Sequence, residues 1–182
     1  MTAKAFALFE TPIGTCAITW SGARIAGFQL PEGGAEATRR RVRNRQAGAV
    51  ESVPPPAIQH AIERVQALLR GEPVDLSEFE VDLGDAPEFN RKVYEVARTI
   101  PPGRTMTYGE IARKIGVGPE MARDVGQALG RNPVAVFVPC HRVLAASGKM
   151  GCFSATGGVS TKRRMLEIEG AAALGAGPLF QR

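Results

Sequence analysis

The sequence predicts an α/β fold in two parts, a small N-terminal sheet with helices followed by a mainly helical C-terminal part. Three observations predict it. Short β-prone runs occupy the first thirty residues, helical spacing dominates after residue 87, and 182 residues suffice for one small and one compact domain. We expect domains over residues 1–84 and 85–175, followed by a tail over residues 176–182.

Three strands are expected at the start of the chain. Ala5–Phe9, Thr15–Trp20 and Arg24–Gln29 are apolar or β-branched runs, separated by Pro12-Ile13-Gly14 and Ser21-Gly22. Such short turn sequences between strands are typical of hairpins. The pattern predicts a small antiparallel meander.

Two helices should follow the meander. The first carries the basic cluster Arg39–Arg45, which we interpret as a solvated helix face rather than a DNA contact. The second runs over Ala57–Arg70, because apolar residues recur there at helical spacing before Gly71. The acidic stretch to Asp85 is a connection, with one further strand as a candidate near Phe79–Leu83.

The C-terminal part contains tightly punctuated helices. Apolar spacing predicts one helix from Phe89 to Ile100, ended by Pro101-Pro102-Gly103. Thr107 and Glu110 have the spacing of a capping box, so a helix should run from Tyr108 to near Ile115-Gly116. Pro119 can start another that ends at Gly130. The last two helices have the spacing of a helix-turn-helix, although two merely packed helices show the same pattern.

Composition excludes several classes of protein. The formal net charge of +5 suits a polyanionic partner without requiring one. No stretch is long and apolar enough for a signal peptide or a membrane span, so we expect a cytoplasmic, nucleoid-associated protein without a membrane partner. Three cysteines without a C-x-x-C pair, and two histidines, argue against a disulfide framework and against a metal site.

The chemistry is expected at Pro139-Cys140-His141-Arg142, which follows the apolar run Val134–Val138. A thiolate is a strong nucleophile, and a nearby base or cation lowers the thiol pKa from its free value of about 8.5. From these residues alone, an inert core thiol stays the alternative.

A longer set of motifs surrounds this cysteine. In chain order they are Phe89, Ile100-Pro101-x-Gly103, Thr107-Tyr108-Gly109-x-Ile111-Ala112, Ala122-Arg123-x-Val125-Gly126-x-Ala128, Asn132-Pro133, Pro139-Cys140-His141-Arg142-Val143, Gly157-Gly158 and Glu169-Gly170. With them the chain closely resembles the O6-alkylguanine-DNA alkyltransferases, also called methylated-DNA–protein-cysteine methyltransferases. The resemblance covers residues 87–173 strongly and extends loosely to Thr11-Pro12-Ile13-Gly14.

The resemblance implies a ribonuclease-H-like N-terminal domain and a winged-helix, helix-turn-helix-type DNA-binding domain. It also implies a single-turnover repair enzyme that flips the nucleotide and moves the alkyl group of O6-alkylguanine irreversibly onto its own cysteine. O4-alkylthymine is a further candidate substrate. The implied partner is double-stranded DNA carrying the lesion, no cofactor is implied, and we expect a monomer, with cooperative assembly on DNA left open.

The resemblance also implies catalytic roles. Cys140 is the nucleophile and permanent acceptor, His141 the general base through a bound water, and Glu169 the group that orients the histidine. Tyr108 donates a proton or hydrogen bond to the guanine ring, which neutralises the leaving anion. Without the resemblance, Glu169 reads as a solvated carboxylate and Tyr108 as a core residue.

The implied DNA contacts come from several elements. Arg123 enters the base stack, and the small residues Ala122 and Gly126 let their helix approach the minor groove. Ser154 contacts the O6 side of the base, and Asn90 contacts phosphate. Asn132 is a structural brace near the cysteine. Taken alone, Arg123 is a solvated helix residue and Ser154 ordinary turn chemistry.

One loop departs from the family pattern. Gly151–Gly158 is two residues longer than usual, with Phe153 where tyrosine is common, and it includes Cys152. Because this loop is expected to wall the base pocket, it bears on which alkyl groups fit.

Three other functions remain as alternatives. The first is a lesion-binding protein without chemistry, although such proteins lack the acceptor cysteine. The second is a helix-turn-helix regulator, and the third is a cysteine hydrolase. Replacing Cys140 by serine separates them.

Overall fold

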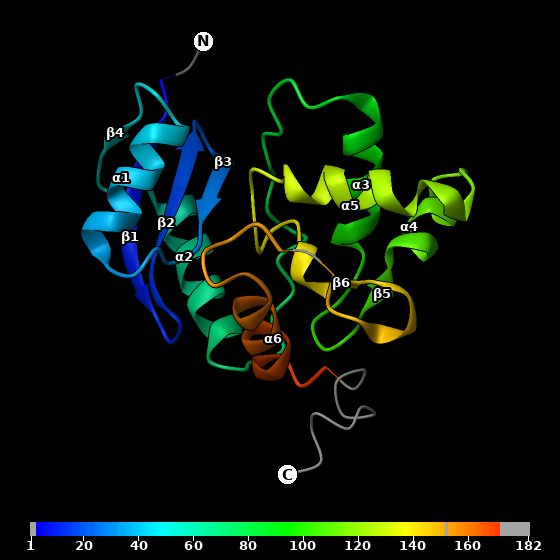
Figure 1. Ribbon diagram of the computed structural model, residues 1–182. Helices are drawn as coiled ribbons and strands as arrows, with labels where there is room; N and C mark the ends of the chain where they lie inside the picture. Colours follow the sequence, from blue (N-terminus) through cyan, green and yellow to red (C-terminus); the bar gives the residue numbers. More distant parts are fainter. Residues whose placement is uncertain (1–2, 152, 172–182) are drawn as a thin grey trace. The chain divides into compact units, whose positions relative to one another are not determined.

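The computed structural model describes residues 3–151 and 153–171 (Figure 1). Strands and helices of the N-terminal part are β1 (Ala5–Thr11), β2 (Gly14–Ser21), β3 (Arg24–Gln29), α1 (Ala35–Arg45), β4 (Val50–Glu51) and α2 (Pro56–Leu69). Those that follow are α3 (Glu88–Arg98), β5 (Met106–Thr107), α4 (Tyr108–Lys114), α5 (Ala122–Gly130), β6 (Val143–Leu144) and α6 (Gly158–Ile168). Short 3₁₀ turns lie at Pro119–Met121, Cys140–Arg142 and Ala146–Gly148.

The predicted antiparallel meander is confirmed, and with it the mixed α/β class. β1 pairs antiparallel with β2, β2 pairs antiparallel with β3, and the short β4 adds to β1 in parallel. Thr15–Trp20 in β2 is buried throughout, so both faces of the central strand are covered. α1 lies over the sheet in Figure 1 and packs Val42 against Phe6 and Ala17. β4 was not expected, because two residues are too few for a periodic pattern.

The strand expected near Phe79–Leu83 is wrong. Only an isolated bridge between Ile25 and Val81 forms there, with Asp82 N donating to Ile25 O at 2.8 Å. The Asp82 carboxylate then accepts from Gly84 N at 2.9 Å, which turns the chain and ends the extended stretch.

The predicted capping box is confirmed at the start of α4. Thr107 Oγ1 accepts from Glu110 N at 3.1 Å, and Glu110 Oε2 accepts from Thr107 N at 2.6 Å. Two backbone donors are thereby satisfied, which stabilises the helix by about 1 kcal/mol. Gly116, at a positive φ of 83°, follows the helix end as expected. The position of this cap matters because Tyr108 is the first residue of the helix.

The winged-helix detail is not confirmed. A wing is a strand hairpin, whereas the described strands of the C-terminal part are β5 and β6, a parallel pair of two residues each. No helix among the described residues is long and apolar enough to cross a bilayer.

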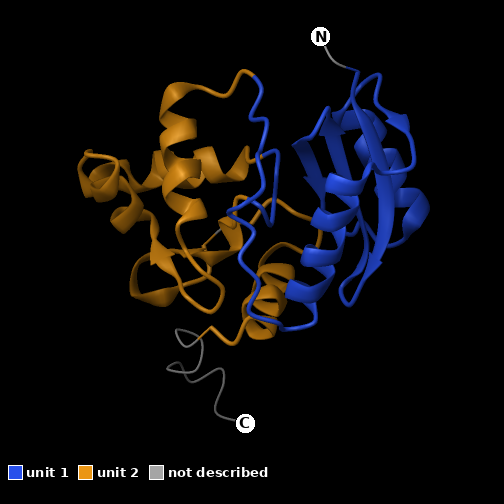
Figure 2. Cartoon of the chain, turned by 180° about the vertical axis from the view of Figure 1, so that it is seen from behind, with its two compact units in different colours: residues 1–84, 133–137 blue, residues 85–132, 138–182 orange. Residues whose placement is uncertain are grey.

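The described residues form two compact units, residues 3–84 with 133–137, and residues 85–132 with 138–151 and 153–171 (Figure 2). In the first unit Val134 bridges Phe28, and Phe137 stacks edge-on against Phe28 and Phe79 at centroid distances of 5.8 and 5.7 Å. The sequence does not indicate that residues 133–137 belong to the first unit, because a buried apolar run fits the core of either unit. We retain the boundary after residue 84 as a proposal.

Candidate active site

Cys140 lies at the first position of a 3₁₀ turn in the second unit. The turn follows from local hydrogen bonds: Cys140 N donates to Val138 O at 2.8 Å, and Arg142 N donates to Pro139 O at 2.9 Å. Asn132 Nδ2 donates to Val138 O at 2.8 Å, so the amide that we expected to brace this loop lies against it. Cys140 is half-buried, while His141 and Arg142 are buried.

His141, Arg142 and Glu169 form a buried polar cluster. His141 Nε2 lies 2.8 Å from Glu169 Oε1, and both side chains are at most 2% exposed. Arg142 donates to both oxygens of the same carboxylate, at 2.9 and 2.8 Å, and to Ile100 O at 2.7 Å. Glu169 follows the end of α6, so that helix brings the carboxylate to the turn that carries Cys140.

Charge and burial set the ionisation of this cluster. Burial alone opposes ionisation of Glu169, but the contacts with His141 and Arg142 outweigh it and lower the pKa of Glu169 to about 2. Burial lowers the pKa of His141; Glu169 opposes this shift, and the cations Arg142 and Lys162 add to it. The histidine is therefore neutral beside an ionised carboxylate.

This arrangement assigns the tautomer of His141. An ionised carboxylate only accepts hydrogen bonds, so Nε2 carries the proton and Nδ1 presents a lone pair. Among the described residues no hydrogen-bond partner reaches Nδ1, although the atom is buried. A buried acceptor of this kind is a natural site for an ordered water.

Cys140 and Tyr108 line one small cavity. Its other lining residues are Gly126, Leu129, Gly130, Phe153 and Ser154. The cavity volume is about 10 Å³, enough for a single water and far too small for a base. Ser154 Oγ donates to Gly130 O at 3.2 Å, which links the loop to the end of α5.

A groove of about 710 Å³ runs beside this cavity. Tyr108, Ala122, Arg123 and Gly126 line it together with residues of α4 and of the segment at 145–151. Arg123 is exposed at the start of α5, and Gly126 packs under the ring of Tyr108, where an added Cβ would lie 3.8 Å from the ring. The structure therefore brings four of the expected DNA-facing residues to one surface.

Asn90 lies elsewhere, buried on α3 with 8% of its surface exposed. Its side chain hydrogen-bonds the hydroxyl of Tyr94, which in turn donates to Ala128 O at 2.8 Å. This burial argues against the expected phosphate contact through the Asn90 side chain.

Sequence reasoning assigned no role to two buried charged residues of this site, Arg142 and Lys162. Arg142 stood inside the motif, but no role was assigned to it. Lys162 is fully buried on α6, and its ammonium donates to Val143 O. Met165 and Leu166 are buried on the same helix, three and four residues after Lys162. This spacing places Lys162 on the apolar face of the helix, and it is the sequence signal that could have indicated its burial.

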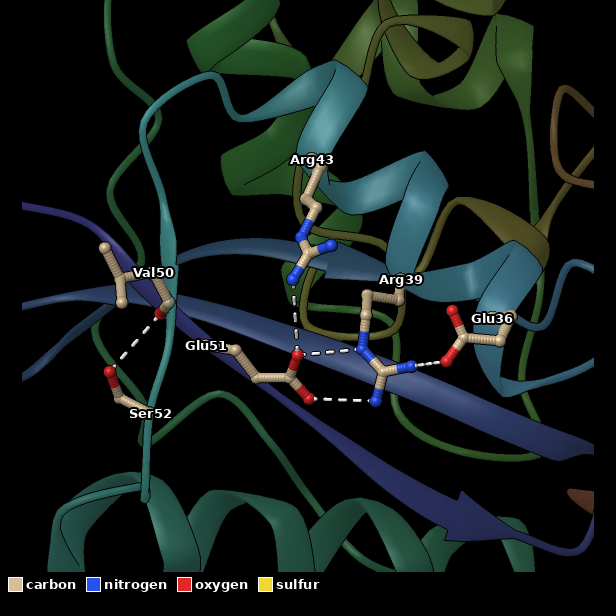
Figure 3. A network of polar contacts seen from close by, with 6 residues as sticks. All are labelled: Glu36, Arg39, Arg43, Val50, Glu51 and Ser52. Carbon is tan, nitrogen blue, oxygen red and sulfur yellow. Dashed lines mark hydrogen bonds and ion pairs between the residues drawn. The ribbon is translucent and has the colours of Figure 1, made fainter.

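The basic helix α1 is largely engaged with carboxylates of its own unit (Figure 3). Arg39 pairs with Glu36 and donates to both oxygens of Glu51, at 2.8 and 3.1 Å, and Arg43 approaches Glu51 at 3.8 Å. The guanidinium of Arg39 lowers the pKa of Glu51 through these bonds. Such pairing reduces the positive charge that this helix can offer to phosphate.

The other cysteines differ from Cys140. Cys16 is buried in β2, and burial raises its pKa to about 12, so it is a poor nucleophile. Cys152 lies outside the described residues. Among residues 3–151 and 153–171, no three potential metal ligands gather in one place.

Known proteins are similar to this chain in sequence and in fold. Residues 88–171 match the family described as "6-O-methylguanine DNA methyltransferase, DNA binding domain". The methylated-DNA–protein-cysteine methyltransferase of Mycobacterium tuberculosis (strain H37Rv) is 37% identical over 161 residues, 88% of each chain. That of Methanosarcina acetivorans is 34% identical over 91% of this chain and 97% of its own.

Solved structures also match this chain. The crystal structure of Mycobacterium tuberculosis O6-methylguanine methyltransferase matches with a TM-score of 0.74 and 32% identity, over 92% of this chain and 93% of that one. The structure of the Mycobacterium tuberculosis protein OGT in complex with DNA matches with a TM-score of 0.75 and 32% identity, over 93% and 97%. This chain therefore belongs to the methylated-DNA–protein-cysteine methyltransferase family.

Proposed function

We propose that this protein repairs DNA by direct reversal, moving the alkyl group of O6-alkylguanine irreversibly onto Cys140. One observation carries the assignment of residues. Cys140 lines a cavity shared with Tyr108, and its neighbour His141 holds a buried lone pair while its other nitrogen contacts an ionised carboxylate. These are the parts of an activated thiol nucleophile. Double-stranded DNA is the partner, and the protein acts on it as a monomer without a cofactor.

The proton path starts at the thiol. Burial raises the pKa of Cys140, opposed by Asn132, Lys162 and nearby backbone amides, so the resting sulfur needs a base. We propose a water that bridges the thiol and His141 Nδ1. The histidine takes the proton through this water, and Glu169 stabilises the imidazolium that forms.

The alkyl carbon then changes partners. The thiolate electron pair forms the S–C bond, the C–O6 bond breaks, and its electrons pass to guanine. Guanine leaves as an anion and takes up one proton, and the imidazolium of His141 returns one proton to solvent, so the thiol proton is in effect exchanged for the alkyl group. Tyr108, at the cavity wall, donates to the ring and lowers the barrier by neutralising this charge. No step regenerates the thiol, so each molecule acts once.

The target carbon is inaccessible in a stacked duplex, so the nucleotide must leave the helix. We propose that α5 enters the minor groove, that Arg123 fills the space vacated by the base, and that Ser154 exchanges its bond with Gly130 O for the O6 side of guanine. The exposed Arg123 and the small residues Ala122 and Gly126 on the groove support this placement.

The decisive experiment is incubation with a duplex that contains one O6-methylguanine, followed by peptide mass spectrometry. We expect one added methyl per protein, on the Cys140 peptide, with guanine restored in the DNA. A protein that binds the lesion and leaves both Cys140 and the DNA unchanged would instead be a recognition protein.

Replacing Arg123 by alanine should slow repair of the duplex on the order of a hundredfold, because the flipped state loses the group that fills the stack. Reaction with the free base O6-methylguanine should be unchanged, since no flipping is needed. Arg70→Ala, which removes one exposed charge from the first unit, is the matched control. Equal losses on duplex and free base would remove the flipping role; single-turnover rates measure both.

A further inference from the structure

Lys162 is a buried cation of the candidate active site that takes no step in the proposed mechanism. Its ammonium lies 5.7 Å from the ring centroid of Tyr108 and 5.9 Å from that of Phe153. Both rings line the small cavity into which Cys140 also faces. Val143, whose carbonyl accepts from Lys162, donates its own N–H to Cys140 O. The lysine is thus connected to the cysteine both through the cavity wall and through the turn.

Burial makes this placement costly. A lysine with none of its surface exposed keeps its charge only where the surroundings compensate for lost hydration. The two aromatic faces and the carbonyl supply part of that compensation. A charge held here at such a cost acts strongly on its neighbours, because a low local dielectric screens it little.

The formal charges of the cluster point the same way. With Cys140 as a thiol and His141 neutral, Arg142 and Lys162 contribute two positive charges and Glu169 one negative. Arg142 engages both oxygens of Glu169. When His141 takes the proton, the thiolate adds one negative charge and the imidazolium one positive charge. The group therefore keeps a net charge of +1, and the new anion forms among an excess of cations.

We propose that Lys162 is a positioning residue for alkyl transfer, a buried counter-charge that stabilises the Cys140 thiolate as it forms. The inference rests on the proposed role of Cys140 as the acceptor. It extends that role by naming the group that makes a buried thiolate attainable. Lys162 touches no reacting atom in this scheme and acts through the sulfur.

Other groups also face Cys140 and belong to its ionisation. Asn132 and the backbone amides at the turn favour the thiolate, His141 is the base, and Tyr94 on α3 interacts electrostatically with the sulfur. Tyr108 faces it across the cavity from α4. Lys162 contributes the positive charge from α6.

The test measures the reactivity of Cys140 without DNA. The full-length protein is treated with iodoacetamide between about pH 5 and pH 10, and alkylation of the Cys140 peptide is followed by mass spectrometry. In Lys162→Met, we expect the midpoint of the pH profile to rise by about one unit, with a roughly tenfold slower reaction at neutral pH. Lys162→Arg should keep the midpoint near that of the unchanged protein, because it keeps the charge.

Controls separate this role from a structural one. Arg164→Met removes an exposed charge from the same helix and should leave the profile unchanged. Lys162→Met leaves the carbonyl of Val143 without its donor, so thermal unfolding is measured for each variant to establish that it folds. If Lys162→Met does not fold, Lys162→Gln takes its place in the same measurement.

The proposal would be overturned if a variant that folds and carries no charge at position 162 had the same pH midpoint as the unsubstituted protein. The repair assay with O6-methylguanine DNA is run in parallel on the unsubstituted protein. A shifted iodoacetamide profile with no repair by the unsubstituted protein would reject the proposed function alone, and repair with an unshifted profile would reject the role of Lys162 alone.

Discussion

Replacing Cys140 by serine should abolish alkyl transfer, with a loss of at least about a thousandfold, while DNA binding persists. The serine hydroxyl is far less acidic than a thiol, and a neutral histidine acting through water cannot ionise it to a useful extent. The groove residues on α5 are untouched by the change. Transfer is measured as methyl gained by the protein in a single turnover, and binding as retardation of a lesion-containing duplex.

Cys16→Ser is the control for this substitution. Cys16 is a buried thiol on β2 with its pKa raised to about 12, so its loss should leave transfer intact. Methyl that still accumulates on the Cys140→Ser protein at a comparable rate would place the acceptor elsewhere in the chain.

Replacing Glu169 by glutamine should have the second largest effect. The change leaves the buried Arg142 without its carboxylate, and breaking one partner of a buried pair costs about 3 to 5 kcal/mol. It also replaces the ionised, acceptor-only carboxylate that keeps the proton of His141 on Nε2 by a neutral amide, which can donate as well as accept. We therefore expect denaturant unfolding to show a loss of this order, and single-turnover transfer to fall roughly a hundredfold.

The pKa of Glu169 predicts how the free energy of unfolding depends on pH. Its pKa in the folded protein, about 2, lies below its ordinary value near 4.5, so the folded state binds its proton less readily than the unfolded chain. The stabilisation is therefore present above about pH 4.5 and is lost as the pH falls toward about 2. Unfolding midpoints measured across this window should fall for the unchanged protein, and this part of the slope should be missing in Glu169→Gln.

Glu167→Gln is the matched control, because Glu167 is exposed at the end of α6, two residues before Glu169. It should retain both the acid slope and the transfer rate. An acid slope that is the same in Glu169→Gln as in the unchanged protein would show that the buried pair does not stabilise the fold.

Local signals predicted much of this fold. The meander follows from β-prone runs separated by turn residues, and α4 from a capping box whose two hydrogen bonds are both present. These features depend on residues close together in sequence, which is why they could be read directly. The candidate site was predicted from the family resemblance of its motifs, and the structure shows Cys140, Tyr108 and Gly126 lining one cavity.

The remainder depends on contacts between residues far apart in the chain. Arg142 reaches Glu169 across 27 positions and Ile100 across 42, and no local pattern reports either bond. Lys162 shares the apolar face of α6 with Met165 and Leu166, but that position does not specify which buried groups it contacts. The strand expected near Phe79–Leu83 failed for the same reason, because pairing needs a partner that β-propensity does not specify.

The excursion of residues 133–137 into the first unit has a consequence for synthesis. The aromatic cluster of that unit includes Phe28, Phe79 and Phe137, so it is completed only by a residue more than fifty positions beyond Gly84. During synthesis, the N-terminal sheet therefore lacks part of its aromatic packing until α3, α4 and α5 have been made. Cys140 lies three residues after Phe137, so the proposed acceptor thiol is synthesised directly after the residue that completes this aromatic cluster.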